Sequence, residues 1–121
     1  MYSAETFERF KNPKFAGQIS DADAVGEIGN FKCGDAMKIY LKIKNGKIED
    51  IKFETYGCVA AIASTDMMCE LVKGKTLDEA YEMSNQEIVR GLKGMPQVKV
   101  HCSILGTRSL RAAIDEYRKK S

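Results

Sequence analysis

The sequence predicts an α+β fold, a small antiparallel three-stranded sheet with helices packed on one face. Two observations predict it. Apolar and polar residues alternate on both sides of Asn45-Gly46, which is typical of a β-hairpin, and helical spacing dominates the chain after residue 58. Because the strands come before most of the helices instead of alternating with them, the sequence favours an α+β fold over a parallel sheet.

Length and composition indicate one domain, residues 1–121, whose core needs no disulfide. Hydrophobic residues at 44% and charged residues at 30% exclude the disordered and membrane classes. The longest apolar run, Cys58 to Ala63, is too short to span a membrane, and the N-terminus shows no apolar leader, so we expect a cytoplasmic protein. A dispersed net charge of +2 argues against nucleic-acid binding.

The first predicted elements are a short helix and an edge strand. Ser3 suits the N-cap of a helix that runs to about Lys11 and carries Phe7 and Phe10 on one side. A loop rich in glycine and aspartate follows. Within it, only residues 24–28 form a plausible strand, and we place that strand at an edge of the sheet.

The hairpin is the central element of the prediction. Residues 35–44 and 47–56 alternate with a period of two, and the Asn45-Gly46 dipeptide between them suits a type I′ turn. This turn places Lys44 opposite Lys47, so opposed residue numbers sum to 91. Ile48 is out of phase with the apolar residues that follow it, which predicts a bulge near residues 49–50 and a register slip of one.

Helices follow the hairpin. The first spans 59–73 and ends at Gly74, and the last begins between residues 103 and 107. Two short helices between them each open with a capping box, in which a hydroxyl and a glutamate three residues later cap the helix. The capping pairs are Thr76 with Glu79 and Ser84 with Glu87, and the last helix has Leu110, Ala113, Ile114 and Tyr117 at core spacing.

The four cysteines include no CxxC pair, and a cytosolic protein of this size needs no disulfide. We therefore consider metal binding or thiol chemistry as their role before disulfide formation. Extending the hairpin register brings Cys33 opposite or next to Cys58. Cys69 lies eleven residues beyond Cys58, about 16 Å along a helix, and cannot share a metal with it. We expect Cys69 to be a small apolar residue of the core.

The remaining candidates cluster around those two cysteines. Cys58 and Cys102 each come just before a predicted helix, whose free N–H groups favour a thiolate. His101 is either a ligand or proton carrier, or a partly exposed polar residue, and both interpretations stay open. Asp35 shares a face with Cys33 if the chain there is extended. Without Cys33, we would interpret Asp35 as a solvated turn residue.

Three thiolates with one carboxylate or imidazole form a ligand set that suits Zn²⁺ or an iron–sulfur cluster. We therefore place a metal site at one end of the sheet. A carboxylate is a hard ligand that holds iron less firmly than a fourth thiolate would. That asymmetry favours a cluster that must leave. An electron-transfer ferredoxin would use four cysteines, and a cysteine hydrolase would need a histidine base that reaches the nucleophile and a third group that orients it.

Four segments together carry a resemblance to a known family. In this order and at these spacings, they resemble the IscU family of iron–sulfur cluster scaffolds, also known as the N-terminal domain of NifU, over nearly the whole chain. The four segments are Cys33-Gly-Asp-Ala-Met-Lys38, Thr55-Tyr-Gly-Cys-Val-Ala-Ala-Ile-Ala-Ser64, Val72-Lys-Gly-Lys-Thr-Leu-Asp-Glu-Ala80 and Val98-Lys-Val-His-Cys-Ser-Ile-Leu105.

The resemblance implies a non-enzymatic scaffold. Such a protein accepts sulfur from a cysteine desulfurase, builds a transient [2Fe-2S] cluster from iron and sulfide, and passes the cluster to acceptor apoproteins. The cluster is held within one chain or between the chains of a homodimer. The resemblance also implies that Cys102 is the main persulfide acceptor. By motif, the cluster-site and metal residues are Cys33, Asp35, Cys58, His101 and Cys102.

Two comparisons within the family sharpen the expectation. Many bacterial members carry Leu-Pro-Pro-Val-Lys where this chain has Met95-Pro-Gln-Val-Lys99, which makes docking of a dedicated Hsp70 chaperone doubtful. The zinc-containing SufU branch has an insertion before the last cysteine and lacks the preceding histidine, whereas this chain has His101 and no insertion. The alternative function is a zinc-binding sulfur acceptor or transferase, with zinc in the resting site.

Overall fold

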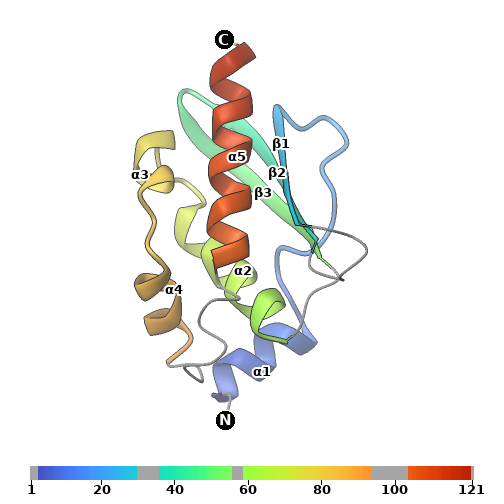
Figure 1. Cartoon of the computed structure of the whole chain (residues 1–121), viewed down its shortest axis with the longest axis vertical. Coiled ribbons are helices and arrows are strands. Elements are labelled where there is room, and N and C mark those ends of the chain that lie inside the picture. Colours follow the sequence, from blue (N-terminus) through green and yellow to red (C-terminus); the bar gives the residue numbers. More distant parts are fainter. Residues whose placement is uncertain (1–2, 30–35, 56–58, 94–103, 121) are drawn as a thin grey trace.

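The computed structural model describes residues 3–29, 36–55, 59–93 and 104–120. The sheet has three strands. Figure 1 shows the long C-terminal helix lying across this sheet, with the first helix at the opposite end of the molecule from the C-terminal end of the long helix. In chain order the elements are α1 (Ala4–Lys11), β1 (Ala24–Ile28), β2 (Met37–Lys44), β3 (Lys47–Thr55), α2 (Val59–Val72), α3 (Leu77–Tyr81), α4 (Asn85–Gly91) and α5 (Ile104–Lys120).

The sheet is antiparallel with the order β1-β2-β3, which confirms the predicted α+β fold and the edge position of β1. Residues that alternate along each strand point to the same face. The residues of β2 and β3 that face α2 and α5 are the apolar ones, and these two helices cover that face (Figure 1). None of the described helices is both long and apolar enough to cross a membrane.

The hairpin turn and its bulge are as predicted. Asn45 and Gly46 have φ values of 55° and 75°, the left-handed conformation that a type I′ turn requires at both positions. Lys42 pairs with Asp50 while Ile43 pairs with Ile48, so one extra residue sits in β3. The bulge turns Ile48, Ile51 and Phe53 toward the same core.

Two other segments pair with the outer edge of β3, and the sequence did not predict either. Phe53 donates its N–H to the carbonyl of Phe15 and accepts from the N–H of Gly17, each at 2.9 Å. Near the hairpin, Ile48 donates to the carbonyl of Lys75 at 2.9 Å and accepts from Gly74 at 2.8 Å. Backbone groups of β3 that would otherwise face solvent are therefore satisfied from both ends.

Helix α5 crosses β1 at Gly26, the one glycine of that strand. A Cβ added to Gly26 would lie 2.2 Å from the carbonyl oxygen of Ser109 and 2.4 Å from the nitrogen of Ala113. No side chain fits at such distances, so glycine lets the helix backbone rest directly on the strand. This contact places the middle of α5, around Ser109 and Ala113, directly on β1.

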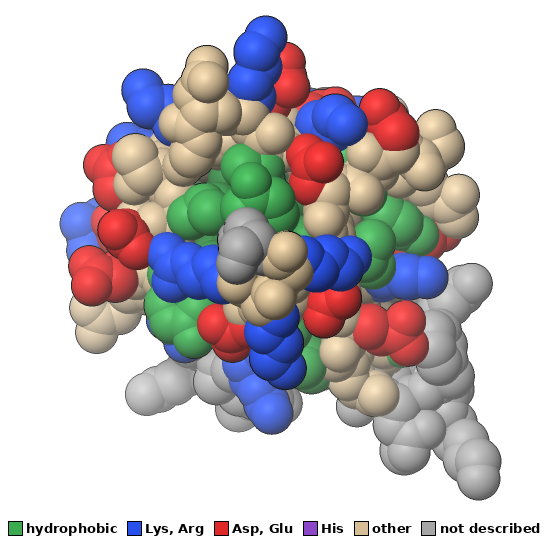
Figure 2. Space-filling view, turned by 90° about the horizontal axis from the view of Figure 1, so that it is seen from above, with side chains coloured by type: hydrophobic (Ala, Val, Ile, Leu, Met, Phe, Trp, Pro, Cys, Tyr) green, Lys and Arg blue, Asp and Glu red, His purple; other side chains and the backbone are tan. Residues whose placement is uncertain are grey.

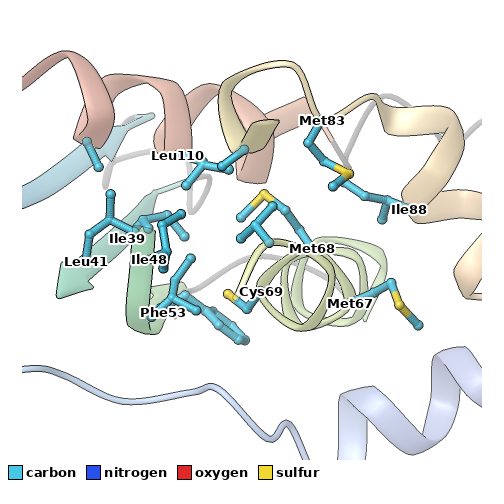
Figure 3. Close-up of a cluster of buried hydrophobic side chains, with 14 of the residues drawn as sticks. Ile39, Leu41, Ile48, Phe53, Met67, Met68, Cys69, Met83, Ile88 and Leu110 are labelled. Carbon is cyan, nitrogen blue, oxygen red and sulfur yellow. The ribbon is translucent and has the colours of Figure 1, made fainter. Parts of the chain in front are cut away.

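The core combines the inner face of the sheet with α2, α4 and α5 (Figure 3). Methionine and cysteine from α2 meet isoleucine and phenylalanine from the hairpin there. Thioether side chains adapt to the irregular space between a helix and a twisted sheet. The labelled members in Figure 3 are Ile39, Leu41, Ile48, Phe53, Met67, Met68, Cys69, Met83, Ile88 and Leu110.

The helix termini follow the predicted signals. Ser3 accepts the N–H of Thr6 as N-cap of α1, and the capping boxes of α3 and α4 are both complete. Gly74, with a φ of 87°, follows α2 closely. In α1 the side that carries Phe7 and Phe10 is largely exposed, at 42% and 38%. The helix is held instead through its buried polar residues, described below.

Seen from the end of α5, the surface mixes charges of both signs (Figure 2). Arg118 donates to the carboxylate of Asp78 at 2.5 Å, and Lys120 lies 3.6 Å from that of Glu116. The basic C-terminal end of α5 is thus interleaved with acidic groups.

Candidate functional site

All five residues that the sequence assigns to the site lie outside the described residues. They are Cys33, Asp35, Cys58, His101 and Cys102. Their convergence therefore stays a prediction. What the structure describes is the residues that adjoin them in the chain: Ala36 before β2, Thr55 at the end of β3, Val59 at the start of α2 and Ile104 at the start of α5.

The candidate residues lie in three segments of the chain, and two of these segments connect to the same end of the sheet. Met37 pairs with Ile28 of β1 on one side and with Thr55 of β3 on the other, which makes the last row of the sheet. The connection that contains Cys33 and Asp35 joins β1 to β2 at this end, and the one that contains Cys58 leaves β3 there. The sheet topology thus brings both connections to the same end of the sheet.

Helix α5 is fastened to the same end of the sheet. The Ser109 hydroxyl donates to the carbonyl of Met37 at 3.3 Å, and both residues are fully buried. One turn earlier, a Cβ on Gly106 would lie 2.8 Å from Oγ1 of Thr65, so α5 also packs tightly on α2. The Thr65 hydroxyl is buried and has no hydrogen-bond partner within the described ranges.

The first turns of α2 and α5 share a feature of their composition. Neither first turn contains an aspartate or a glutamate. Unpaired N–H groups there carry partial positive charge, which favours an anion such as a thiolate close to the helix start. This agrees with the chemistry expected of cysteines that come before those helices.

A hollow of about 300 Å³ opens beside the end of β3. Its walls come from α1, the segment that pairs with β3, the end of β3 itself and α2. Among the described residues, the lining is mostly apolar, with one carboxylate. The residues are Phe10, Pro13, Ala16, Gly17, Phe53, Glu54, Thr55 and Ile62.

Glu54 supplies the carboxylate of that hollow, and it accepts a hydrogen bond from Tyr40 on the outer face of the sheet. Burial, and then the hydrogen bond to Glu54, raise the pKa of Tyr40 to about 12. The same bond, with a second one from Gln18 at 2.8 Å, lowers the pKa of Glu54. Glu54 is therefore a hydrogen-bonded anion at neutral pH, and Tyr40 a neutral donor.

Cys69 is the one cysteine that the structure describes, and it is a core residue as predicted. Its side chain is fully buried in the cluster of Figure 3. Burial above all, together with the nearby carboxylate of Asp66, raises the pKa of its thiol well above the ordinary value. A buried neutral thiol is a poor nucleophile and a poor ligand. Among the described residues, no group of His, Cys, Asp or Glu is arranged to hold a metal ion.

The sequence interpretation missed an ionic cluster between α1 and α2, in which Arg9 and Asp66 are buried and Glu5 and Glu70 are partly exposed. Arg9, 5% exposed, donates to Asp66 at 2.8 Å, to Glu70 at 2.7 Å and to Glu5 at 3.0 Å. Hydrogen bonds from Arg9, and its charge, lower the pKa of Glu70. The spacing of Glu5 and Arg9, and of Asp66 and Glu70, is four residues in each helix. That spacing was the available signal, although it does not tell which two helices meet.

Comparison with known proteins supplies the family. The chain matches the model of the NifU-like N terminal domain over residues 1–121. It is 49% identical over 121 residues to the iron-sulfur cluster assembly scaffold protein IscU 1 of Archaeoglobus fulgidus, which covers all of this chain and 79% of that protein. It is 42% identical over 123 residues to IscU of Escherichia coli, covering 98% of this chain and 95% of that protein.

Solved structures agree on the fold. A putative iron-sulfur cluster assembly scaffold protein for the SUF system from Fervidobacterium islandicum superposes with a TM-score of 0.75 at 31% identity, over 93% of this chain and 96% of the other. The N-terminal part of a NifU-like protein from Brucella abortus gives 0.76 at 22% identity, over 98% and 95%, and shows the fold alone. With its whole length matched, the chain belongs to the NifU-like N-terminal domain family.

Proposed function

We propose that residues 1–121 form a single scaffold domain on which an iron–sulfur cluster is assembled and then passed on. The observation that carries this proposal is similarity along the full chain to proteins named as IscU scaffolds, at up to 49% identity. The cluster is cargo that the protein builds and releases. The protein itself is not an enzyme.

Sulfur arrives from a cysteine desulfurase. In this proposal the Cys102 thiolate attacks the outer sulfur of the desulfurase persulfide, and the desulfurase cysteine leaves as a thiolate. The start of α5, with no acid in its first turn, supports Cys102 in this role because positive partial charge favours the thiolate. Two electrons from an external reductant then convert the transferred sulfur to sulfide.

Iron is held by thiolates and by one harder ligand. Cys33, Cys58 and Cys102 supply the thiolates of a [2Fe-2S] cluster, and Asp35 or His101 completes the set. The last row of the sheet, in which Met37 pairs with Ile28 and Thr55, supports this set. The segment that contains Cys33 and Asp35 and the segment that contains Cys58 both connect to the sheet at this end. An exchangeable oxygen or nitrogen ligand suits transfer to acceptor apoproteins.

Anaerobic reconstitution with Fe²⁺, cysteine, a desulfurase and a thiol reductant that supplies the electrons for sulfide formation tests the proposal. We expect visible absorption bands of a [2Fe-2S] cluster and equal amounts of iron and sulfide. A parallel sample purified without reconstitution is analysed for zinc. A chain that keeps stoichiometric zinc, accepts sulfur and never acquires iron with sulfide would contradict the scaffold and favour a zinc-binding sulfur acceptor.

A further inference from the structure

Two side-chain hydroxyls bind consecutive backbone carbonyls where β2 begins. Thr55 Oγ1 donates to the carbonyl of Ala36 at 2.8 Å. Ser109 Oγ donates to the carbonyl of Met37 at 3.3 Å. Ala36, Met37 and Ser109 are at most 2% exposed. Water has little access to these buried groups, so the protein itself satisfies the two carbonyls.

The two bonds join three elements, β2, β3 and α5, that each lead to a segment carrying candidate ligands. Ala36 directly follows Asp35 in the chain. Thr55 stands three residues before Cys58, and Ser109 stands seven residues after Cys102. Each hydroxyl therefore joins the start of β2 to a different element, Thr55 from β3 and Ser109 from α5.

We infer that Thr55 and Ser109 are positioning residues of the candidate cluster site. This inference rests on the proposed function. They touch neither iron nor sulfur in this role. By fixing two successive carbonyls of one strand to β3 and to α5, they set the relative placement of the backbones that lead into the ligand segments. Groups that hydrogen-bond directly to metal ligands typically change metal affinity by about 10- to 100-fold when they are lost. Thr55 and Ser109 act through the neighbouring backbone, so we expect effects at the lower end of that range.

The chain contains a matched control for the loss of a buried hydroxyl. Ser64 is fully buried, like Ser109, and its Oγ also donates to a carbonyl at 3.3 Å. That carbonyl belongs to Ala61 of the same helix, so the bond joins no two segments. Replacing Ser64 with alanine removes the same group at the same burial and leaves the links to β2 intact.

The experiment compares the native chain with Thr55→Val, Ser109→Ala, Thr55→Ser and Ser64→Ala. Co²⁺ is the spectroscopic probe, titrated anaerobically and followed by its visible bands. A second measurement is the half-life of a reconstituted [2Fe-2S] cluster against a chelator. Urea unfolding of each protein, without metal, measures the general loss of stability.

We expect Thr55→Val and Ser109→Ala to bind Co²⁺ about tenfold more weakly than the native chain, with shifted bands, and to lose the cluster correspondingly faster. Thr55→Ser keeps the hydroxyl and should behave as native. Ser64→Ala should lower the urea midpoint about as much as Ser109→Ala and still bind as native. A purely structural role would not separate these two alanine variants.

The outcomes are distinct. Native affinity, spectrum and half-life in both Thr55→Val and Ser109→Ala would overturn the inference alone. A Ser64→Ala variant that loses binding as much as Ser109→Ala would also overturn it, because general loosening would then explain the effect. A native chain that holds neither Co²⁺ nor a cluster would contradict the proposed function and the inference with it.

Discussion

Nη1 of Arg9 donates to Oδ2 of Asp66 at 2.8 Å, across 57 residues of sequence, and both side chains are buried. The other oxygen of Asp66 accepts the backbone N–H of Phe15 at 2.8 Å. Burial lowers the pKa of Arg9, but its hydrogen bonds to Glu70, Asp66 and Glu5 raise it by more, so the guanidinium stays charged. One carboxylate of α2 thus holds both α1 and the segment that pairs with β3.

Removing Arg9 should destabilise the fold strongly. Arg9→Met leaves Asp66 buried without its cation, and breaking a buried pair in this way costs about 3–5 kcal/mol. The measurement is the free energy of urea unfolding. Lys14→Ala is the control, because Lys14 lies 3.5 Å from Glu70 but is 68% exposed, and its loss should cost less than about 0.5 kcal/mol. Equal effects of the two substitutions would contradict a stabilising role for the buried Arg9–Asp66 ion pair.

Low pH should weaken the contact between Arg9 and Glu70 in the same ionic cluster. Because Arg9 lowers the pKa of Glu70, the folded state favours its carboxylate, and the resulting stability is present above the unfolded pKa, about 4.3. It is lost as the pH falls below that value and through the lower folded pKa. Unfolding followed between pH 7 and pH 3 should show a steeper loss for the native chain than for Glu70→Gln. Parallel curves would mean that the Glu70 contact contributes nothing.

Gly26→Ala should be among the most damaging single-methyl changes in the described fold. The added Cβ meets α5 backbone atoms at 2.2 and 2.4 Å, so the helix must shift away from β1, at a cost of about 3 kcal/mol. Gly46→Ala is the comparison, since its Cβ has nothing within 4 Å and only its φ of 75° is unfavourable. Thermal unfolding should rank Gly26→Ala well below Gly46→Ala. The reverse ranking would contradict the close crossing.

Cysteine substitutions should divide the four thiols into two classes. Cys33→Ser, Cys58→Ser and Cys102→Ser should each abolish cluster assembly, whereas Cys69→Ala should keep it, because Cys69 lies in the core. Mass spectrometry after incubation with desulfurase and cysteine, without iron, should place the added sulfur on Cys102. Sulfur on Cys69 alone, or a cluster retained by Cys33→Ser, would refute the assignment.

Asp35→Ala should permit assembly and slow release. In the proposed site, Asp35 is a hard, exchangeable ligand whose departure would open iron to an incoming acceptor thiolate, so its loss should trap the cluster. The measurement is the rate of cluster transfer to an apo-ferredoxin from native and variant chains with equal iron content, without any chaperone. Transfer from Asp35→Ala that is as fast as native would move the release role to His101.

Local signals predicted the elements well. The Asn45-Gly46 turn, the bulge beside Ile48 and the capping boxes each depend on residues within a few positions of one another, so the sequence states them directly. The pairing of Arg9 with Asp66 and the approach of Ser109 to Gly26 depend on which distant segments meet. Periodicity identifies a face of a helix or strand and leaves its partner unspecified.

The candidate site divides in the same way. Motif and spacing assigned its five residues, and those assignments stay predictions because the residues lie outside the described ranges. The burial of Cys69 could be predicted, because cysteine is a small apolar residue and Cys69 falls on the same helix face as Ile62, Thr65 and Val72. The hydroxyls of Thr55 and Ser109 could not, because a serine or threonine in an element carries no sign of the carbonyl it will meet.

The covered side of β3 limits how copies of this protein could join through their sheets. Phe15 and Gly17 occupy one part of that edge and Gly74 and Lys75 another, whereas within the described residues β1 pairs only with β2. Among the described strands, β1 is therefore the one whose outer edge could serve a contact between sheets, with β1 of each copy related by a twofold axis. Such a contact closes on itself, so growth would stop at a pair and could not continue into a fibre.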